Sequence, residues 1–308
     1  MSHPWLNDYA EHLQLRGRSP GTVYTTRTWV VRFADYLALH KVGDWRNITD
    51  EHVDGFHRDL RWQRCATGQC YAEATVDVAM RVLCGFFKYV VRRGLLLLNP
   101  TRTLDLVKPR KRIRRIPTVA EVARLLQGPN PRTPIGLRDR AVLELMYGTG
   151  IRRSECAALD LTDVDLERRA VDVRRGKGGH HRRAPFPVHV ARVLSRYLDR
   201  ARPLLVRRTD SPALFLSQSG TRLSGQGLQT LFRHHVKLMG LPRLSLHSLR
   251  HACASHLLAN GADMEDIQQL LGHRSPTTTA QYTHVTADEL RTLHRRTHPR
   301  ASPEPSEN

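Results

Sequence analysis

The sequence predicts a mainly α-helical protein with a small antiparallel β element, divided into two domains. At roughly 150 residues per domain, its 308 residues correspond to two domains. Apolar side chains recur at helical spacing along most of the chain, and only two short segments, 170–174 and 183–187, alternate as strands do. With 40% hydrophobic residues, the chain has enough apolar material for two modest cores, which argues against disorder throughout.

The first domain, expected over residues 1–105, is predicted to contain four helices joined by short loops. The first helix is short and lies near the N-terminus. Ser19, directly before a proline, is typical of an N-cap and predicts the start of the second helix. Thr49, followed by two acids, predicts the third start. The fourth helix is expected to begin at Thr75 and to stop at Gly94.

The connection at 61–74 contains Cys65 and Cys70. Their spacing can suit a metal, but no second pair of Cys or His lies at a matching spacing nearby, so a surface loop is the favoured interpretation. Five scattered cysteines argue against a disulfide framework and for a reducing cytoplasm. The N-terminus lacks the pattern of a signal peptide, and the longest aliphatic run, 95–98, is far too short to span a membrane.

The net charge of +20 results from 49 Lys and Arg residues against 29 Asp and Glu residues. All but six of these cations are Arg, whose planar fork suits phosphate oxygens, so a nucleic acid is the expected partner. A GC-rich genome would also raise the ratio of Arg to Lys, but it would leave the net charge unexplained.

A basic interdomain linker is expected at 106–116, where Pro109 and the following Pro117 exclude a regular helix. No acid occurs between Asp105 and Glu121. The cations expected to bind DNA there are Lys108, Arg110, Lys111, Arg112, Arg114 and Arg115. A nuclear-localisation signal is an alternative interpretation of such a run, although nothing else in the sequence indicates a nucleus.

The second domain, expected over residues 117–296, is predicted to be mixed. Thr118 predicts a helix start, and residues 139–147 predict a second helix. The two alternating segments flank the Gly-rich stretch 176–179, which predicts a hairpin. Further helices are expected up to residue 296, followed by a tail at 297–308 that ends in a Pro-, Ser- and Glu-rich stretch and is expected to be disordered.

Two windows of this domain, 173–198 and 211–262, contain no Asp or Glu but several Lys and Arg residues. Soluble surfaces normally mix both signs of charge. The two windows therefore predict a face shaped for an anion.

Several polar residues in or near these windows occupy positions that solvation does not require. Lys177 lies at the tip of the Gly-rich hairpin, and His247 and Arg250 are three residues apart on a predicted helix, where they share a face. Taken singly, each has an ordinary structural explanation. The full candidate set is Arg152, Glu155, Lys177, His247, Arg250, His273 and Tyr282.

These candidates lie in five short motifs that follow one another in a fixed order. The motifs are Gly-Ile-Arg-Arg-Ser-Glu at 150–155, Gly-Lys-Gly at 176–178, His-Ser-Leu-Arg-His at 247–251, Leu-Gly-His at 271–273 and Tyr-Thr-His at 282–284. The ordered set resembles the tyrosine recombinase (phage integrase) family, and most closely its Xer-like members.

The resemblance covers nearly the whole chain. Ser-Pro-Gly-Thr-Val-Tyr at 19–24 resembles part of the family's core-binding domain, and residues 293–301 resemble a Xer C-terminus. The resemblance implies an N-terminal helical core-binding (SAM-like) domain and a C-terminal α/β catalytic domain. It also suggests Ser19 and Thr22 as DNA contacts.

The resemblance implies the roles of the matched residues. Tyr282 would be the nucleophile that attacks a DNA phosphodiester and forms a 3′-phosphotyrosine. Arg152 and Arg250 would clamp the non-bridging oxygens of the transition state with forked donors. His247 and His273 would add hydrogen bonds to the same oxygens.

Lys177 would protonate the leaving 5′-oxygen. Glu155 cannot face a phosphate without repulsion, so it is expected to support an arginine or a helix terminus. The chemistry implies neither ATP nor a metal, because the phosphotyrosine keeps the bond energy and the arginines supply the positive charge. A metalloprotease motif would need a glutamate directly after His247, where this chain has Ser248.

The resemblance implies a site-specific recombinase that acts on double-stranded DNA with a pair of inverted binding sites. Four protomers would assemble on two DNA sites, either as a homotetramer or with a second recombinase, and the helix at 287–296 would dock on a neighbouring protomer. Mobile-element integration or excision is the first interpretation of its biological role, because the 61–74 loop looks longer than in a housekeeping Xer protein. Chromosome or plasmid dimer resolution is the alternative. Two alternatives belong to other functional classes: a DNA-binding protein without catalytic activity, and a type IB topoisomerase that relaxes DNA.

Overall fold

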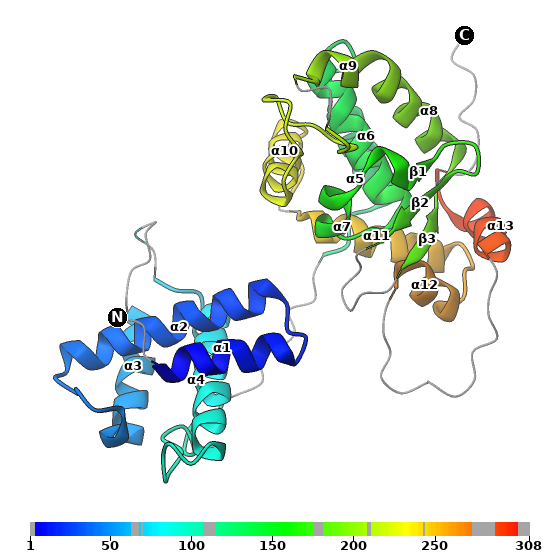
Figure 1. Cartoon of the computed structure of the whole chain (residues 1–308). Coiled ribbons are helices and arrows are strands. Elements are labelled where there is room, and N and C mark those ends of the chain that lie inside the picture. The colour runs from blue at the N-terminus through cyan, green and yellow to red at the C-terminus, as the bar shows by residue number, and fades with distance from the viewer. Residues whose placement is uncertain are drawn as a thin grey trace. The chain divides into compact units, whose positions relative to one another are not determined.

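The computed structural model describes residues 4–62, 68, 70–106, 115–174, 181–207, 211–242, 244–272 and 287–300. It is mainly helical with one small antiparallel sheet, which confirms the predicted fold class (Figure 1). The chain divides into two compact units, Met1–Arg112 and Ile113–Asn308. Within the described ranges, no helix is long and apolar enough to cross a membrane.

The first unit contains the four helices that the sequence predicts. They are α1 (Pro4–Leu15), α2 (Pro20–Leu39), α3 (Asp50–Trp62) and α4 (Glu73–Arg92), with the short 3-10 helix η1 (Trp45–Asn47) between α2 and α3. Phe33 of α2 lies at the centre of the core, fully buried. Its ring meets Phe56 of α3 and Phe87 of α4 edge-on, with centroids 5.1 and 5.8 Å away. Aromatic packing of this kind joins the three longer helices into one core.

The two residues suggested as DNA contacts in this unit lie at the start of α2. Ser19 is the N-cap, and its Oγ accepts a hydrogen bond from the backbone N of Thr22 at 3.2 Å. The hydroxyls of Ser19 and Thr22 are 2.9 Å apart, and both residues are exposed. They therefore stand at the positive end of a long helix, a position that favours an anion. Contact of these two residues with DNA stays a prediction.

In its described ranges, the second unit contains three strands together with the helices that follow. The helices are α5 (Val119–Gln127), α6 (Pro134–Thr149), α7 (Arg153–Ala158), α8 (Val188–Arg196), α9 (Arg202–Leu205), α10 (Gly225–Leu238), α11 (Leu246–Ala259), α12 (Met264–Leu271) and α13 (Ala287–Thr297). A 3-10 turn, η2 (Leu161–Asp163), precedes the sheet, and a π-helical segment, η3 (Tyr197–Ala201), links α8 to α9.

The sheet has the order β1 (Val164–Asp165), β2 (Ala170–Val173) and β3 (Arg182–Pro185). β2 and β3 are antiparallel, with Val171 opposite Ala184, and they confirm the two predicted strands. β1 was not predicted, because two residues are too few for an alternating pattern. The expected hairpin turn at 176–179 lies outside the described residues.

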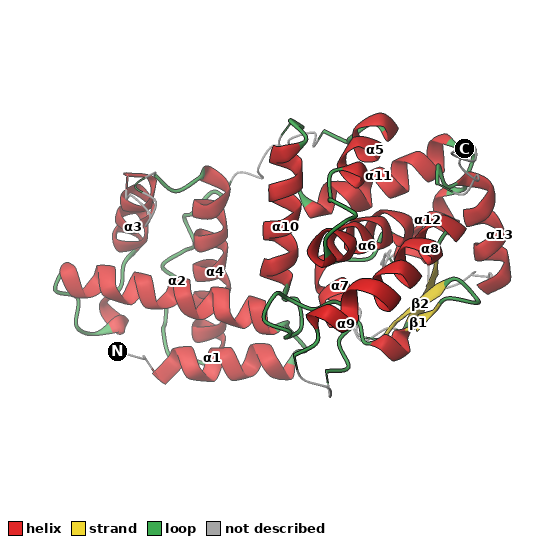
Figure 2. Ribbon diagram, turned by 90° about the horizontal axis from the view of Figure 1, so that it is seen from above, coloured by secondary structure: helices red, strands yellow, loops and turns green. Residues whose placement is uncertain are grey.

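Helix α6 lies in the centre of the second unit, between the sheet and the surrounding helices (Figure 2). It begins earlier than the predicted 139: Thr133 is its N-cap and accepts a hydrogen bond from the backbone N of Gly136 at 3.0 Å. Asp139 is consequently not at the helix start, where an acid usually sits in solvent. It lies inside the helix and is 5% exposed, where Arg138 pairs with it and His235 hydrogen-bonds to it.

The C-terminal segment corrects one expectation. The tail was expected to be disordered from residue 297, but residues 297–300 are ordered against α6. His298 is buried, and Arg300 pairs with the buried Glu144 of α6 at 2.7 Å. The sequence of this segment looks like a solvated tail. The acid that Arg300 pairs with, Glu144, lies 156 residues away, so no local pattern could show the pairing. Residues 301–308 lie outside the described residues.

Helix α13 packs on its own unit in this single chain. His294 is 2% exposed, and its Nε2 donates to the carbonyl oxygen of Gly148 at 2.6 Å. The rings of His294 and His298 stack with centroids 4.7 Å apart. The expected docking of 287–296 on a neighbouring protomer therefore remains a prediction, and in an assembly it would require breaking or exchanging these contacts.

Acid should loosen this docked segment. Burial lowers the pKa of His294 from 6.5 to about 4, although its bond to Gly148 opposes the shift. As the pH falls from about 6.5 to 4, the undocked state takes up the proton first, so docking weakens by about 3 kcal/mol. We expect the protection factors of the α13 amides, which correct for the slower intrinsic exchange in acid, to fall over this range. His294→Gln keeps a donor for Gly148 without titrating, so it should reduce the pH slope, and an equal slope in both proteins would contradict the prediction.

Candidate active site

The candidate site begins where α6 ends. Gly150, the C-cap of α6, has a φ of +61°, and an added Cβ would collide with Leu271. Glycine is therefore required here both for the left-handed turn and for the close approach of α12. The turn brings Arg152 to the N-cap of α7. The Gly-Ile-Arg motif therefore places a guanidinium at the N-terminus of this helix.

Glu155 anchors the start of α7. Its Oε2 accepts a hydrogen bond from the backbone N of Arg152 at 2.7 Å, and its Oε1 accepts one from Nη1 of the same residue at 2.7 Å. The carboxylate is buried, with 1% of its side chain exposed. Burial raises its pKa, but the hydrogen bonds and charges of Arg182 and Arg152 outweigh burial and bring the pKa to about 2. Glu155 is therefore an anion at all physiological pH values, and it supports arginines and the terminus of α7.

Arg250 of α11 is buried at the same place. Its Nη1 donates to the carbonyl oxygen of Gly150 at 2.6 Å, and its Nη2 donates to that of Leu271 at 2.6 Å. Burial and the charges of Arg152 and Arg182 lower the pKa of Arg250 to about 10. The guanidinium nevertheless remains charged near neutrality. Arg250 thus ties α6 and α12 together, and within the described ranges it uses only two of its five N–H groups to do so.

Three arginines meet at the C-terminal end of α12. Arg182 Nε donates to the carbonyl oxygen of Leu270 at 3.2 Å, Arg250 Nη2 to that of Leu271 at 2.6 Å, and Arg152 Nη2 to that of Gly272 at 3.0 Å. The last carbonyls of a helix lack partners within the helix and carry partial negative charge. The carbonyl oxygens at the end of α12 therefore bind three guanidinium groups that come from three other parts of the chain.

Arg182, the first residue of β3, was not identified from the sequence. It donates to both oxygens of Glu155, with distances of 3.0 and 2.8 Å. It lies in an acid-free window with six other cations, and no local pattern distinguishes it from them. Its position in the sequence, five residues after Lys177, is the only local signal that could have suggested it.

The two windows without Asp or Glu predicted the arrangement of charge only in part. Their cations were expected to form a face for an anion, but several are neutralised by acids from the segment 155–165. Arg174 pairs with Asp163, Arg182 with Glu155, Arg183 with Asp165 and Arg222 with Asp160. A window without acids therefore does not imply unpaired cations, because the sheet and the turns bring acids from elsewhere.

His247 lies one turn before Arg250 on α11, as predicted, and it is exposed. Its ring is 4.4 Å from that of His251 in an edge-to-face arrangement. Among the residues that the structure describes, no group of three or more His, Cys, Asp or Glu side chains could hold a metal ion. The histidine pair consequently has no third ligand from that part of the chain.

The remaining predicted site residues can be placed only in part. Lys177, His273 and Tyr282 lie outside the described residues, as do the linker cations from Lys108 to Arg114. His273 directly follows Gly272, whose carbonyl oxygen bonds to Arg152. Arg115 is described: it pairs with Glu121 at 2.7 Å, and about half of its side chain is exposed.

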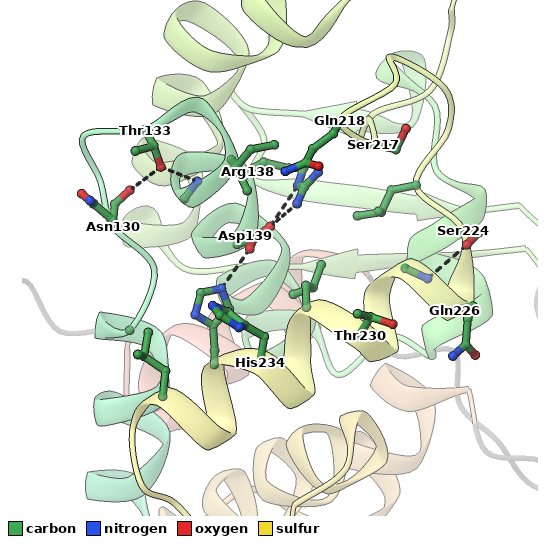
Figure 3. A pocket seen from close by; sticks show the side chains of 18 of the residues that line it. Asn130, Thr133, Arg138, Asp139, Ser217, Gln218, Ser224, Gln226, Thr230 and His234 are labelled. Atoms are coloured by element: carbon green, nitrogen blue, oxygen red, sulfur yellow. Dashed lines mark hydrogen bonds and ion pairs between the residues drawn. The ribbon is translucent and has the colours of Figure 1, made fainter. Parts of the chain in front are cut away.

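A separate pocket lies beside the other end of α6, between the 217–224 segment and α10 (Figure 3). Asp139 is one of the residues that line it, and it accepts hydrogen bonds from Arg138 Nε at 2.9 Å and from His235 Nε2 at 2.9 Å. Arg138 also donates to the carbonyl oxygen of Leu216 at 2.9 Å. This buried network fixes α10 on α6 and contains none of the predicted site residues.

Comparison with known proteins identifies the family. The phage integrase family model matches residues 117–289. Tyrosine recombinase XerC 2 of Ralstonia nicotianae is 37% identical over 297 residues, which cover 96% of this chain and 85% of the relative. Tyrosine recombinase XerD of Corynebacterium glutamicum is 38% identical and covers 98% of both chains. The lambda integrase tetramer bound to a Holliday junction shares the fold, with a TM-score of 0.63 at 20% identity over 91% of this chain and 80% of that chain.

The fold and these matches define a DNA-binding enzyme of site-specific recombination, a tyrosine recombinase. The chain belongs to the phage integrase family and is Xer-like within it. The resemblance drawn from the five motifs is confirmed.

Proposed function

We propose that this recombinase resolves dimers of a chromosome or plasmid, as a Xer-type enzyme. Relatives named XerC and XerD match nearly the full length of both chains, and this observation carries the proposal. The first interpretation from the sequence, mobile-element integration, rested on the 61–74 loop, and much of that loop lies outside the described residues. The comparisons support the alternative better.

The proposed reaction uses the arginine cluster at the end of α12. Arg152 and Arg250 are held there by backbone carbonyls and by Glu155, so their remaining N–H groups are pre-organised for the non-bridging oxygens of a phosphate. Donors fixed before the reaction stabilise the charge that develops in the transition state. His247 and His273 would add hydrogen bonds to the same oxygens.

In the proposed step, the phenolic oxygen of Tyr282 attacks the phosphorus and the bond from phosphorus to the 5′-oxygen breaks. A free phenol has a pKa of about 10, so the cationic site must favour its ionised form. Lys177 would give its proton to the leaving 5′-oxygen. The phosphotyrosine then reacts with a 5′-hydroxyl from another strand, which reverses the bond changes without ATP.

The proposed assembly is four protomers on two DNA sites, each site a pair of inverted repeats. Support comes from lambda integrase, which has been solved as a tetramer on a Holliday junction. The matching relatives include recombinases of two kinds, named XerC and XerD. We take this as support for a heterotetramer that contains a second recombinase. A DNA substrate and scattered cysteines, four of them free in the described parts, are consistent with a cytoplasmic location.

A nicked suicide duplex tests the reaction. We expect a covalent protein–DNA adduct on a denaturing gel when the duplex contains an inverted repeat from the DNA that flanks the gene. The adduct should form in EDTA, and inhibition by EDTA would argue against the metal-free mechanism. Bound DNA without an adduct would leave only an idle DNA-binding protein.

A second assay tests the biological role. A plasmid dimer carrying two directly repeated sites should yield monomers when the partner recombinase is supplied. Relaxation of supercoiled plasmid without a site would favour a topoisomerase instead. Integration of a circle into a separate target, without dimer resolution, would favour a mobile element.

Replacement of Lys177 should slow the proposed cleavage because the leaving 5′-oxygen then departs without a proton. We expect Lys177→Ala to lower the single-turnover rate by on the order of 10²- to 10⁴-fold. A substrate with sulfur at the 5′-bridging position should restore cleavage, since a thiolate leaves unprotonated. Wild-type protein should gain little from the same sulfur. Failure of the rescue would remove Lys177 from the general-acid role.

A further inference from the structure

Glu155 is bonded by two arginines at once. Arg182 contributes Nη1 and Nη2, and Arg152 contributes Nη1 and its backbone N, with all four donor distances between 2.7 and 3.0 Å. Arg182 therefore grips the carboxylate as a fork, whereas Arg152 holds it with one side-chain N–H and one backbone N–H. Forked pairs between arginine and carboxylate are strong and directional.

The cluster holds three guanidinium groups against one carboxylate. Arg250 is 3% exposed and senses the charges of both Arg152 and Arg182. The side chains of Glu155 and Arg182 are also withdrawn from water, with 1% and 13% exposed. Water screens these charges poorly at such depth, so the pairing of each one affects the others.

A carboxylate here competes with the proposed substrate. Arg152 is an arginine expected to bind the scissile phosphate, yet its Nη1 already donates to Glu155. Without Arg182, Glu155 would form its ion pair with Arg152 alone, and its unbalanced negative charge would repel the phosphate. Arg182 satisfies both oxygens of Glu155 from the β3 side, which leaves Arg152 less strongly bound to the carboxylate.

We propose that Arg182 is a positioning residue of the recombinase site: its forked pair with Glu155 neutralises that carboxylate and frees Arg152 to stabilise the scissile phosphate. The role rests on the proposed reaction, because it acts through Arg152. Arg182 itself does not touch the phosphate. It differs from the clamp arginines in that both of its terminal nitrogens are committed to an acid.

A purely structural role is the competing explanation. Arg182 also bonds to the carbonyl oxygen of Leu270, and its side chain lies 3.1 Å from the position that a Cβ on Gly272 would occupy. It could merely hold β3 against α12. The two explanations differ in one respect: only the electrostatic role depends on the charge of Glu155.

A double-mutant cycle separates the two roles. We expect Arg182→Met to slow single-turnover cleavage of the suicide duplex roughly 10- to 100-fold at saturating DNA, by analogy with the loss of a residue that holds a metal-ligating side chain in place. In a Glu155→Gln background the same change should cost less than about threefold, because no carboxylate remains to draw on Arg152. Arg183→Met is the matched control, since it removes a neighbouring cation that pairs with Asp165 instead.

The pH profile gives a second readout. Loss of Arg182 removes the main hydrogen-bonding partner that lowers the pKa of Glu155, so this pKa should rise towards the working range. Cleavage by Arg182→Met, as a ratio to wild type, should then recover as the pH falls from about 8 to 5 and Glu155 becomes neutral. A clamp that only holds β3 in place would leave this ratio flat.

The outcomes are distinguishable. If wild type forms no adduct on bound DNA, the proposed function fails and the role of Arg182 fails with it. If wild type forms the adduct and Arg182→Met slows cleavage equally in both backgrounds with a flat pH ratio, only the role of Arg182 is overturned. Wild-type rates in Arg182→Met would overturn it as well. Cleavage that depends on the charge of Glu155 supports it.

Discussion

Tyr282→Phe is expected to abolish the covalent adduct while DNA binding is retained. The hydroxyl is the atom that forms the bond to phosphorus in the proposed reaction, and phenylalanine offers no nucleophile in its place. Removal of one hydroxyl leaves the net charge of +20 unchanged, so the electrostatic part of DNA affinity should persist. Denaturing gels measure the adduct, and gel shifts on the same duplex measure binding.

The control for this prediction is a second tyrosine. Tyr24 is 74% exposed in the first unit, and Tyr24→Phe should leave the adduct intact. An adduct that persists in Tyr282→Phe would assign the nucleophile to another residue. Loss of both adduct and binding would show that the variant is misfolded, and circular dichroism would report this directly.

Arg250→Lys is expected to have the second largest effect on cleavage. Lysine keeps the charge, but one ammonium cannot reproduce the planar fork that bonds to Gly150 and Leu271 while facing a phosphate. We expect the single-turnover rate at saturating DNA to fall by on the order of 10²- to 10³-fold, the effect of losing one pre-organised donor. The affinity for DNA should change far less.

The choice of lysine limits the effect on folding. Arg250→Ala would leave two carbonyl oxygens at a buried position without a partner, at a cost of about 1–3 kcal/mol each. The melting temperature of the lysine variant should therefore stay nearer to that of wild type than that of the alanine variant. Arg233→Lys, at an exposed position on α10, is the matched control. A wild-type cleavage rate in Arg250→Lys would remove Arg250 from the clamp.

Local patterns predicted most of the fold. Helical spacing and N-caps such as Ser19 and Thr118 identified the helices of the first unit and the start of α5. Both signals depend only on residues close together in the sequence, so they can be recognised without a structure. Helix α6 was placed too late because Asp139 looks like a helix start, whereas its buried partners, Arg138 and His235, allow it to lie inside the helix.

The sequence by itself determined the family and the order of the candidate residues, including Tyr282, because five motifs carry them at characteristic positions. Only the tertiary structure decided how the charges pair. Arg182 and Glu155 are 27 residues apart, and Arg152 and Gly272 are 120 apart. Such pairs form when β3, α7 and α12 pack together, and no local spacing encodes them. The net charge of +20 predicted an anionic partner, but only the packing shows that Arg152 and Arg182 share Glu155 while Arg250 bonds to backbone carbonyl oxygens.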